Sequence, residues 1–153
     1  RDDVESRGLG DVYKRQPDAL SNILRTCRTF TKKRLIALFG CGGDRDKGKR
    51  PIMGRIGGEL ADLCILTSDN PRTEDPMEIL REIEEGIKET TGEYVVIENR
   101  RDAIRHALEI GREGDIIVLC GKGHETYQET MGVKRPFDEK VVVQELLTEL
   151  RGE

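Results

Sequence analysis

Short apolar runs, separated by stretches with helical spacing, recur along most of the chain. The runs at residues 34–40, 61–68, 93–98 and 115–121 each predict a strand. They are almost continuous in apolar side chains, as is typical of strands that are covered by other elements on both faces. Residues 126–135 predict in addition a short hairpin that turns at Met131 and Gly132.

Five of the stretches between and beyond these runs have the spacing of amphipathic helices. The first has four apolar side chains at i, i+3, i+4 and i+7, beginning at Leu20, and Pro17 suits its first turn. Asp75 and Asp138 are N-cap candidates for two others. The predicted helices span residues 17–30, 51–60, 75–90, 102–111 and 138–150.

Strands that alternate with helices indicate βαβ units. The order of the elements therefore predicts an α/β fold that is Rossmann-like, with a mostly parallel sheet, helices on both faces and one antiparallel edge strand. Three glycines, at positions 54, 57 and 58, weaken the prediction of the second helix, because glycine is a poor helix former.

The first 16 residues differ from the rest of the chain. They show no helical or strand period, and residues 11–16 read like the frame translation of a common transposon sequencing adapter. We therefore expect residues 1–16 to be a non-native or disordered segment, and residues 17–153 to form the domain.

Composition narrows the class of protein. Charged residues make up 37% of the chain and aromatic residues 4%, and there is no Trp, so the core has to be built from aliphatic side chains. A net charge of -4 argues against a nucleic-acid partner. No apolar run reaches the roughly 20 residues that a membrane span needs, and no signal peptide opens the chain. We expect a cytoplasmic protein without a membrane or nucleic-acid partner.

The four cysteines do not form a metal-binding pattern. None lies in a C-x-x-C pair, so no metal site is expected. Cys64 and Cys120 lie in apolar runs and are expected to be buried, reduced thiols. Cys41 lies in a glycine-rich loop and is the one thiol to examine for reactivity.

Three polar loops follow three of the predicted strands, at residues 40–50, 69–72 and 121–125. Ligands of open α/β sheets bind beyond the carboxyl ends of the strands, so we expect these loops to meet at one site. Their glycines would let backbone N–H groups approach a ligand closely. Their charges are mixed in sign, which favours a zwitterion over a bare phosphate, with arginine as the better carboxylate partner.

No loop has the G-x-x-x-x-G-K-[ST] pattern of a phosphate loop. His124 lies in the last loop, between Gly123 and Glu125. A structural histidine bonded to the backbone and a ligand or catalytic histidine are both compatible with this position.

Taken together, the segments FGCGGDRDKGKRP at residues 39–51, DNPR at 69–72 and GKGHE at 121–125 resemble the C-terminal domain of the Mur ligases. The resemblance extends from Pro17 to about Leu150. It is closest to the ligases that add the third peptide residue to UDP-N-acetylmuramoyl-dipeptide, and the DNPR motif is the one associated with meso-diaminopimelate.

The resemblance implies a binding site for meso-diaminopimelate. Arg72 would pair with the carboxylate that lysine lacks, Glu125 with the adjacent ammonium group, and Asn70 with either. Lysine would leave Arg72 without this partner, at a cost of a few kcal/mol. The residues implied are Arg45, Asp69, Asn70, Pro71, Arg72, Gly121 and Glu125.

The resemblance also implies an ATP-dependent reaction, in which a carboxylate of the nucleotide-linked peptide is phosphorylated and then attacked by the amino acid. ATP, Mg²⁺ and the UDP-N-acetylmuramoyl dipeptide would bind mainly to domains absent from this chain. We therefore expect no catalytic residue here and no activity of the chain alone. The residues implied near the phosphates are Lys47, Lys49, Arg50 and His124.

Two other functions are compatible with such a fold, because fold alone does not define function. One is a free-standing small-molecule-binding module. The other is a phosphate-binding enzyme that uses the loop at Gly40, although the missing phosphate loop and magnesium ligands argue against it.

Overall fold

A computed structural model describes residues 17–43, 48–120 and 127–152 of the chain. Within these ranges, four strands form a parallel sheet in the order β3-β2-β1-β4. The strands are β1 (Leu35–Phe39), β2 (Leu63–Leu66), β3 (Glu93–Val96) and β4 (Ile116–Leu119). Ala37, at the centre of β1, pairs with Cys64 of β2 on one side and with Val118 of β4 on the other.

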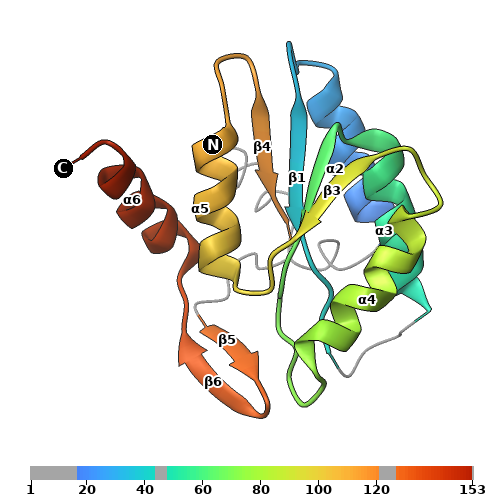
Figure 1. Ribbon diagram of the computed structural model, residues 1–153, viewed down its shortest axis with the longest axis vertical. Coiled ribbons are helices and arrows are strands. Elements are labelled where there is room, and N and C mark those ends of the chain that lie inside the picture. Colours follow the sequence, from blue (N-terminus) through green and yellow to red (C-terminus); the bar gives the residue numbers. More distant parts are fainter. Residues whose placement is uncertain (1–16, 44–47, 121–126, 153) are drawn as a thin grey trace.

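Five helices of the described residues cover both faces of this sheet. They are α2 (Pro17–Arg28), α3 (Lys49–Leu60), α4 (Pro76–Ile87), α5 (Arg100–Ile110) and α6 (Glu139–Leu150). Figure 1 shows α2, α3 and α4 on one side, and α5 and α6 on the other. The predicted α/β fold, with a parallel sheet between two helix layers, is confirmed. Among the described helices, none has both the length and the apolar character that crossing a membrane demands.

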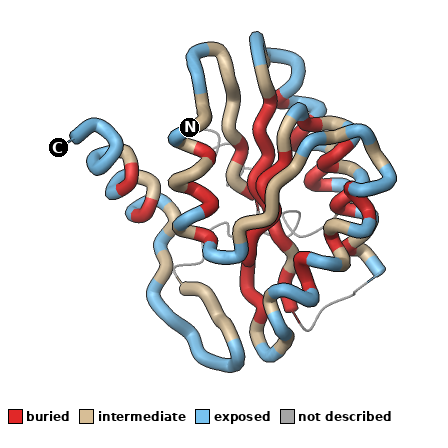
Figure 2. Tube along the Cα trace, viewed as in Figure 1, coloured by how far each residue is buried: buried red, intermediate tan, exposed pale blue. Residues whose placement is uncertain are grey.

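The core follows from the alternation of side chains along β1, which is buried at every position. Leu35, Ala37 and Phe39 pack in the cluster that includes α2, α3 and α4. Ile36 and Leu38 pack in the second cluster, against α5 and α6. Figure 2 shows the buried positions concentrated in β1 and β2 and on the inner sides of the helices.

Local capping sets where the helices begin. Asp75 accepts a hydrogen bond from the backbone N–H of Met77, and Asp138 caps α6 in the same way, as predicted. Helix α5 begins before the predicted Asp102, because the side chain of Asn99 accepts the N–H of Asp102 and caps the helix there.

The antiparallel pairing predicted for an edge of the sheet lies instead in a separate two-stranded sheet. It consists of β5 (Tyr127–Thr130) and β6 (Val133–Pro136). Met131 and Gly132 have φ of 53° and 79°, as a two-residue type I′ turn requires. The predicted hairpin and its turn are therefore confirmed. In Figure 1 the hairpin lies beyond the carboxyl ends of the parallel strands.

An ion pair holds the amino ends of β1 and β4 together. The Asp115 carboxylate accepts from Arg34 Nη2 at 2.8 Å and from the Arg34 backbone N–H at 2.9 Å. It also accepts the backbone N–H of Arg112 at 3.0 Å. The hydrogen bonds from Arg34 lower the pKa of Asp115 from 3.8 to about 2.

This pKa predicts an acid-dependent contribution to stability. The folded pKa lies below the unfolded value, so the contribution is complete above about pH 4 and is lost as the pH falls through about 2. We expect Asp115→Asn to be less stable than the wild type at pH 6, with the difference shrinking toward pH 2 in urea unfolding. The exposed neighbour Glu113 provides the control: Glu113→Gln should keep the wild-type pH dependence. An unchanged difference at all pH values would rule out this linkage.

Helices α3 and α4 touch through their backbones. A Cβ atom on Gly54 would lie 2.1 Å from the carbonyl oxygen of Ile83, and one on Gly86 would lie 1.8 Å from that of Pro51. Gly54, one of the glycines that weaken the helix prediction for α3, therefore has a packing role, because it permits this close approach.

Gly86→Ala tests this contact, because helix propensity and packing predict opposite changes in stability. Alanine favours an isolated helix by about 1 kcal/mol, whereas overpacking costs about 1–3 kcal/mol. We expect net destabilisation in chemical unfolding. Glu85→Ala, at an exposed position of the same helix, should change the stability by less than about 0.5 kcal/mol. A stabilised Gly86→Ala protein would contradict the packing role.

Candidate functional site

The candidate site lies at the carboxyl edge of the sheet, next to β1. The chain runs from β1 to β2 and β3 on one side, and β4 then pairs on the other side of β1. Open α/β sheets bind ligands at such a switch in strand order. The carboxyl ends of β1 and β4 flank it, and residues 44–47 and 121–126 of the loops that follow lie outside the described residues. The site predictions that fall there are Arg45, Lys47, Gly121, His124 and Glu125.

The loops after β1 and β2 are in direct backbone contact. The N–H of Gly43 donates to the carbonyl of Asn70 at 2.7 Å. A Cβ on Gly43 would lie 1.7 Å from the carbonyl oxygen of Pro71, and one on Gly40 would lie 2.0 Å from that of Thr67. These two glycines, expected to let a ligand approach the backbone, instead let the two loops meet.

The predicted DNPR segment is held firmly at this edge. Asp69, Asn70 and Pro71 are buried, and Arg72 is half-buried. Asn70 Oδ1 accepts the backbone N–H of Glu129, in β5, at 2.8 Å. The oxygen end of the Asn70 amide is thus bound within the domain.

Arg72 combines an unusual backbone with a directed side chain. Its φ is 56°, in the left-handed region that non-glycine residues rarely adopt. Its Nη1 donates to the carbonyls of Gly43, at 3.1 Å, and Asn70, at 3.3 Å. The described residues place no acceptor on its Nε or Nη2, the edge that suits a bidentate carboxylate.

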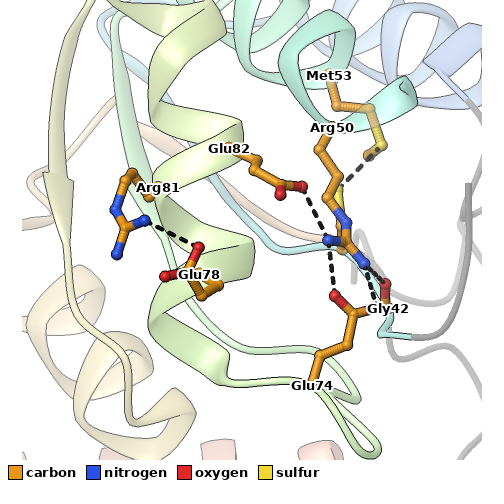
Figure 3. Close-up of polar contacts among 8 residues, drawn as sticks. Gly42, Arg50, Met53, Glu74, Glu78, Arg81 and Glu82 are labelled. Atoms are coloured by element: carbon orange, nitrogen blue, oxygen red, sulfur yellow. Dashed lines mark hydrogen bonds and ion pairs between the residues drawn. The ribbon is translucent and has the colours of Figure 1, made fainter. Parts of the chain in front are cut away.

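Arg50 is buried in an ion-pair cluster, not open toward the site. Its side chain is 1% exposed, and its guanidinium contacts Glu74 at 2.9 Å and Glu82 at 2.9 Å. Nη2 also donates to the carbonyl of Gly42 at 3.0 Å (Figure 3). Burial lowers the pKa of Arg50, but the hydrogen bonds to the two glutamates outweigh this effect and raise it. Helix α3 begins at Lys49 and includes Arg50, which corrects the predicted helix start at Pro51. A role of Arg50 near phosphates stays a prediction.

Arg100 is a second buried arginine, which the pattern of the sequence did not single out. Its Nη1 donates to the carbonyl of Ser68 and its Nη2 to that of Cys120, both at 3.0 Å. Its Nε donates to Glu139, at the start of α6, at 2.6 Å. Ser68 and Cys120 directly precede the two predicted loops at 69–72 and 121–125, so Arg100 fixes the starting points of both.

Lys49 and Cys41 were also singled out in the sequence. Lys49 begins α3 and is partly exposed. All four cysteines are reduced. Burial, and secondarily the nearby Asp69, raise the pKa of the Cys41 thiol to about 12. Cys41 therefore stays protonated near neutral pH, and the reactivity considered for it is not supported. No cluster of three His, Cys, Asp or Glu residues that could hold a metal ion occurs in the described ranges.

Residues 4–123 match the family described as "Mur ligase, glutamate ligase domain". The chain belongs to the Mur ligase family. The match begins within residues 1–16, whose non-native origin stays a prediction. It also includes the loops after β1, β2 and most of the loop after β4, where the site was expected.

Curated relatives in this Mur ligase family are similar over nearly the whole chain. A UDP-N-acetylmuramoyl-L-alanyl-D-glutamate--2,6-diaminopimelate ligase of Clostridium botulinum is 55% identical over 138 residues, which are 90% of this chain and 28% of the relative. The enzyme of the same name from Caldanaerobacter subterraneus is 54% identical over 137 residues, with the same coverage of 90% and 28%. The chain thus spans little more than a quarter of the length of these Mur ligases.

Solved structures agree with this assignment. A structure of a UDP-N-acetylmuramoyl-L-alanyl-D-glutamate--2,6-diaminopimelate ligase is 45% identical, with a TM-score of 0.86, over 91% of this chain and 28% of that one. A murein peptide ligase from Psychrobacter arcticus is 19% identical over 88% of this chain, with a TM-score of 0.59, and shares the fold.

We expect the loss of Arg50 from its ion-pair cluster to have a large effect on stability. Arg50→Met would leave Glu74 and Glu82 facing each other without the cation, and we expect a loss of about 3 kcal/mol in urea unfolding. Adding Glu74→Gln and Glu82→Gln to this variant should recover part of the loss. Arg55, on the same helix, pairs with Glu89 at the surface, so Arg55→Met should cost less than about 1 kcal/mol. Equal losses for the two arginines would contradict this interpretation.

Proposed function

We propose that this chain is the amino-acid-binding domain of an ATP-dependent ligase that adds meso-diaminopimelate to UDP-N-acetylmuramoyl-L-alanyl-D-glutamate in peptidoglycan precursor synthesis. Support comes from relatives of that name, which match 90% of the chain. Because the chain covers 28% of their length, the reaction would require protein beyond it, and we expect the chain alone to be inactive. We place the reaction in the cytoplasm, as proposed from the composition.

The observation that carries this proposal is the geometry of Arg72. Two carbonyls hold one nitrogen of its guanidinium, while the Nε–Nη2 edge has no acceptor among the described residues. Arginine pairs with a carboxylate through two parallel hydrogen bonds along such an edge. Diaminopimelate differs from lysine by one carboxylate, so a fixed arginine that lacks an acceptor favours diaminopimelate.

Other residues of the proposed site have defined but smaller roles. Asn70 is proposed to contact the ligand with its amide, whose oxygen also accepts the backbone N–H of Glu129. Asp69 and Pro71 would shape the segment from its buried side. The other proposed contacts, Arg45, Gly121 and Glu125, lie outside the described residues, and Glu125 is proposed to receive the ammonium group next to the bound carboxylate.

ATP and Mg²⁺ are not assigned to the described part of the chain. Bound ATP would supply the phosphoryl group that activates the carboxylate of the nucleotide-linked peptide. Of the proposed phosphate contacts, Lys49 is partly exposed at the start of α3, and Arg50 is buried among carboxylates. Lys47 and His124 lie outside the described residues. We therefore propose that ATP and Mg²⁺ bind mainly to other domains, and the role of this chain is to bind and orient the amino acid.

A free-standing binding module for the same kind of zwitterion is the alternative. The two functions would use the same binding site, so the gene that encodes the chain has to distinguish them. An in-frame upstream domain with a G-x-x-G-K-[ST] loop would favour the ligase.

Ligand titration of the chain, followed by NMR, tests the amino-acid assignment. We expect meso-diaminopimelate to bind at least about tenfold more tightly than L-lysine, because lysine leaves Arg72 without its carboxylate. Both affinities should be weak, since the complete site needs the other domains. In Arg72→Met the two ligands should bind within about threefold of each other.

The matched control is Arg81→Met, since Arg81 is an exposed arginine of α4 that pairs with Glu78. It should keep the wild-type preference for diaminopimelate. Equal affinity of the wild type for the two amino acids would overturn the proposed substrate.

A further inference from the structure

The hairpin β5–β6 holds Arg72 in its left-handed conformation. The N–H of Arg72 donates to the carbonyl of Glu129 at 2.9 Å, and its own carbonyl accepts from Gly132 at 3.0 Å. Arg72 also forms an isolated parallel bridge with Thr130. A left-handed non-glycine residue costs free energy and persists where its surroundings hold it there. Here the hairpin supplies the partners for both backbone groups of Arg72.

Gln128 extends this contact with its side chain. Its Nε2 lies 2.9 Å from the carbonyl oxygen of Asp69 and 3.4 Å from that of Ser68. Both facing atoms are acceptors, so the amide nitrogen of Gln128 has to be the end that meets them. The shorter distance identifies the Asp69 carbonyl as the main partner.

The segment from Ser68 to Arg72 is therefore attached to the hairpin along its length. Gln128 holds the first two carbonyls, the Glu129 N–H holds the side chain of Asn70, and Glu129 and Gly132 hold the backbone of Arg72. The contacts from Glu129 and Gly132 use backbone atoms. The Gln128 contact is made by a side chain, so a substitution can remove it.

We propose that Gln128 is a positioning residue for amino-acid selectivity. Its amide fixes the Ser68–Asp69 backbone, and with it the placement of Arg72 three to four residues later. Gln128 does not contact the ligand in this proposal; it acts through Arg72. The proposal rests on the proposed function for its ligand, although the contacts themselves do not depend on it.

Two substitutions separate the effect of the hydrogen-bond donor of Gln128 from the effect of its side-chain shape. Gln128→Met keeps the length and removes the donor. Gln128→Glu keeps the shape and presents a carboxylate to two carbonyl oxygens, which repel it. Gln144→Met is the matched control, because Gln144 is an exposed glutamine on α6.

The first readout is the preference for meso-diaminopimelate over L-lysine, measured as the ratio of the dissociation constants for the chain. We expect this ratio to fall about fivefold in Gln128→Met, the effect of losing one neutral hydrogen bond, and further in Gln128→Glu. Gln144→Met should keep the wild-type ratio. If the role of Gln128 were purely structural, Gln128→Met would weaken the binding of both ligands equally. An unchanged ratio in Gln128→Met therefore overturns the proposal.

The second readout needs no ligand. In hydrogen exchange of the ligand-free chain, Gln128→Met should speed the exchange of the Arg72 amide at least about fivefold, because its bond to Glu129 opens more often. The amide of Cys64, in the central strand β2, should keep its wild-type rate. An unchanged Arg72 rate would overturn the positioning role.

The two readouts separate this inference from the proposed function. If the wild type binds the two amino acids equally, the substrate assignment fails and the selectivity role fails with it. Faster exchange at Arg72 would still support the positioning of that residue by Gln128. If the wild type prefers diaminopimelate and the Gln128 variants behave like it in both readouts, the inference alone fails.

Discussion

The backbone beyond the carboxyl ends of the parallel strands leaves polar groups that the sheet does not pair, and these have to find other partners. Two buried guanidinium groups donate hydrogen bonds to three of these backbone carbonyls. Arg100 donates to the carbonyls that end β2 and β4, and Arg50 donates to the loop after β1. A guanidinium suits the task because its donors lie in one rigid plane, and nearby carboxylates offset the burial of its charge. The backbone just beyond β1, β2 and β4 is therefore bound to side chains of α3 and α5.

The elements that pack against the sheet could be predicted from the sequence, because burial imposes their periodicity. The apolar run at β1 and the helical spacing that begins at Leu20 both reflect contact with the core. The hairpin turn was predictable for a different reason, since Gly132 readily adopts the positive φ that a tight turn requires. The start of α5 was not predicted, because it depends on one cap at Asn99 and leaves no periodic signal.

The meeting of the loops after β1 and β2 could be predicted, because parallel strands end at one edge of the sheet. The side-chain contacts at this edge could not. The partners of Asn70 and Arg50 lie far away in the sequence: Glu129 is 59 residues from Asn70, and Glu82 is 32 residues from Arg50. No local pattern encodes such pairs. The same holds for Arg100, whose partners Ser68, Cys120 and Glu139 lie 32, 20 and 39 residues away in the sequence.

The glycine contact between α3 and α4 has a mechanical consequence. Shear motions in proteins arise when packed helices slide past each other by small amounts, through small adjustments of the side chains between them. At Gly54 and Gly86 no side chain lies between the two backbones, so there is nothing at these points to readjust. This close contact disfavours sliding of α3 past α4. Both helices begin at the carboxyl edge of the sheet, where the candidate site lies. A rotation of the whole domain would therefore move this edge without changing the distance between the starts of α3 and α4.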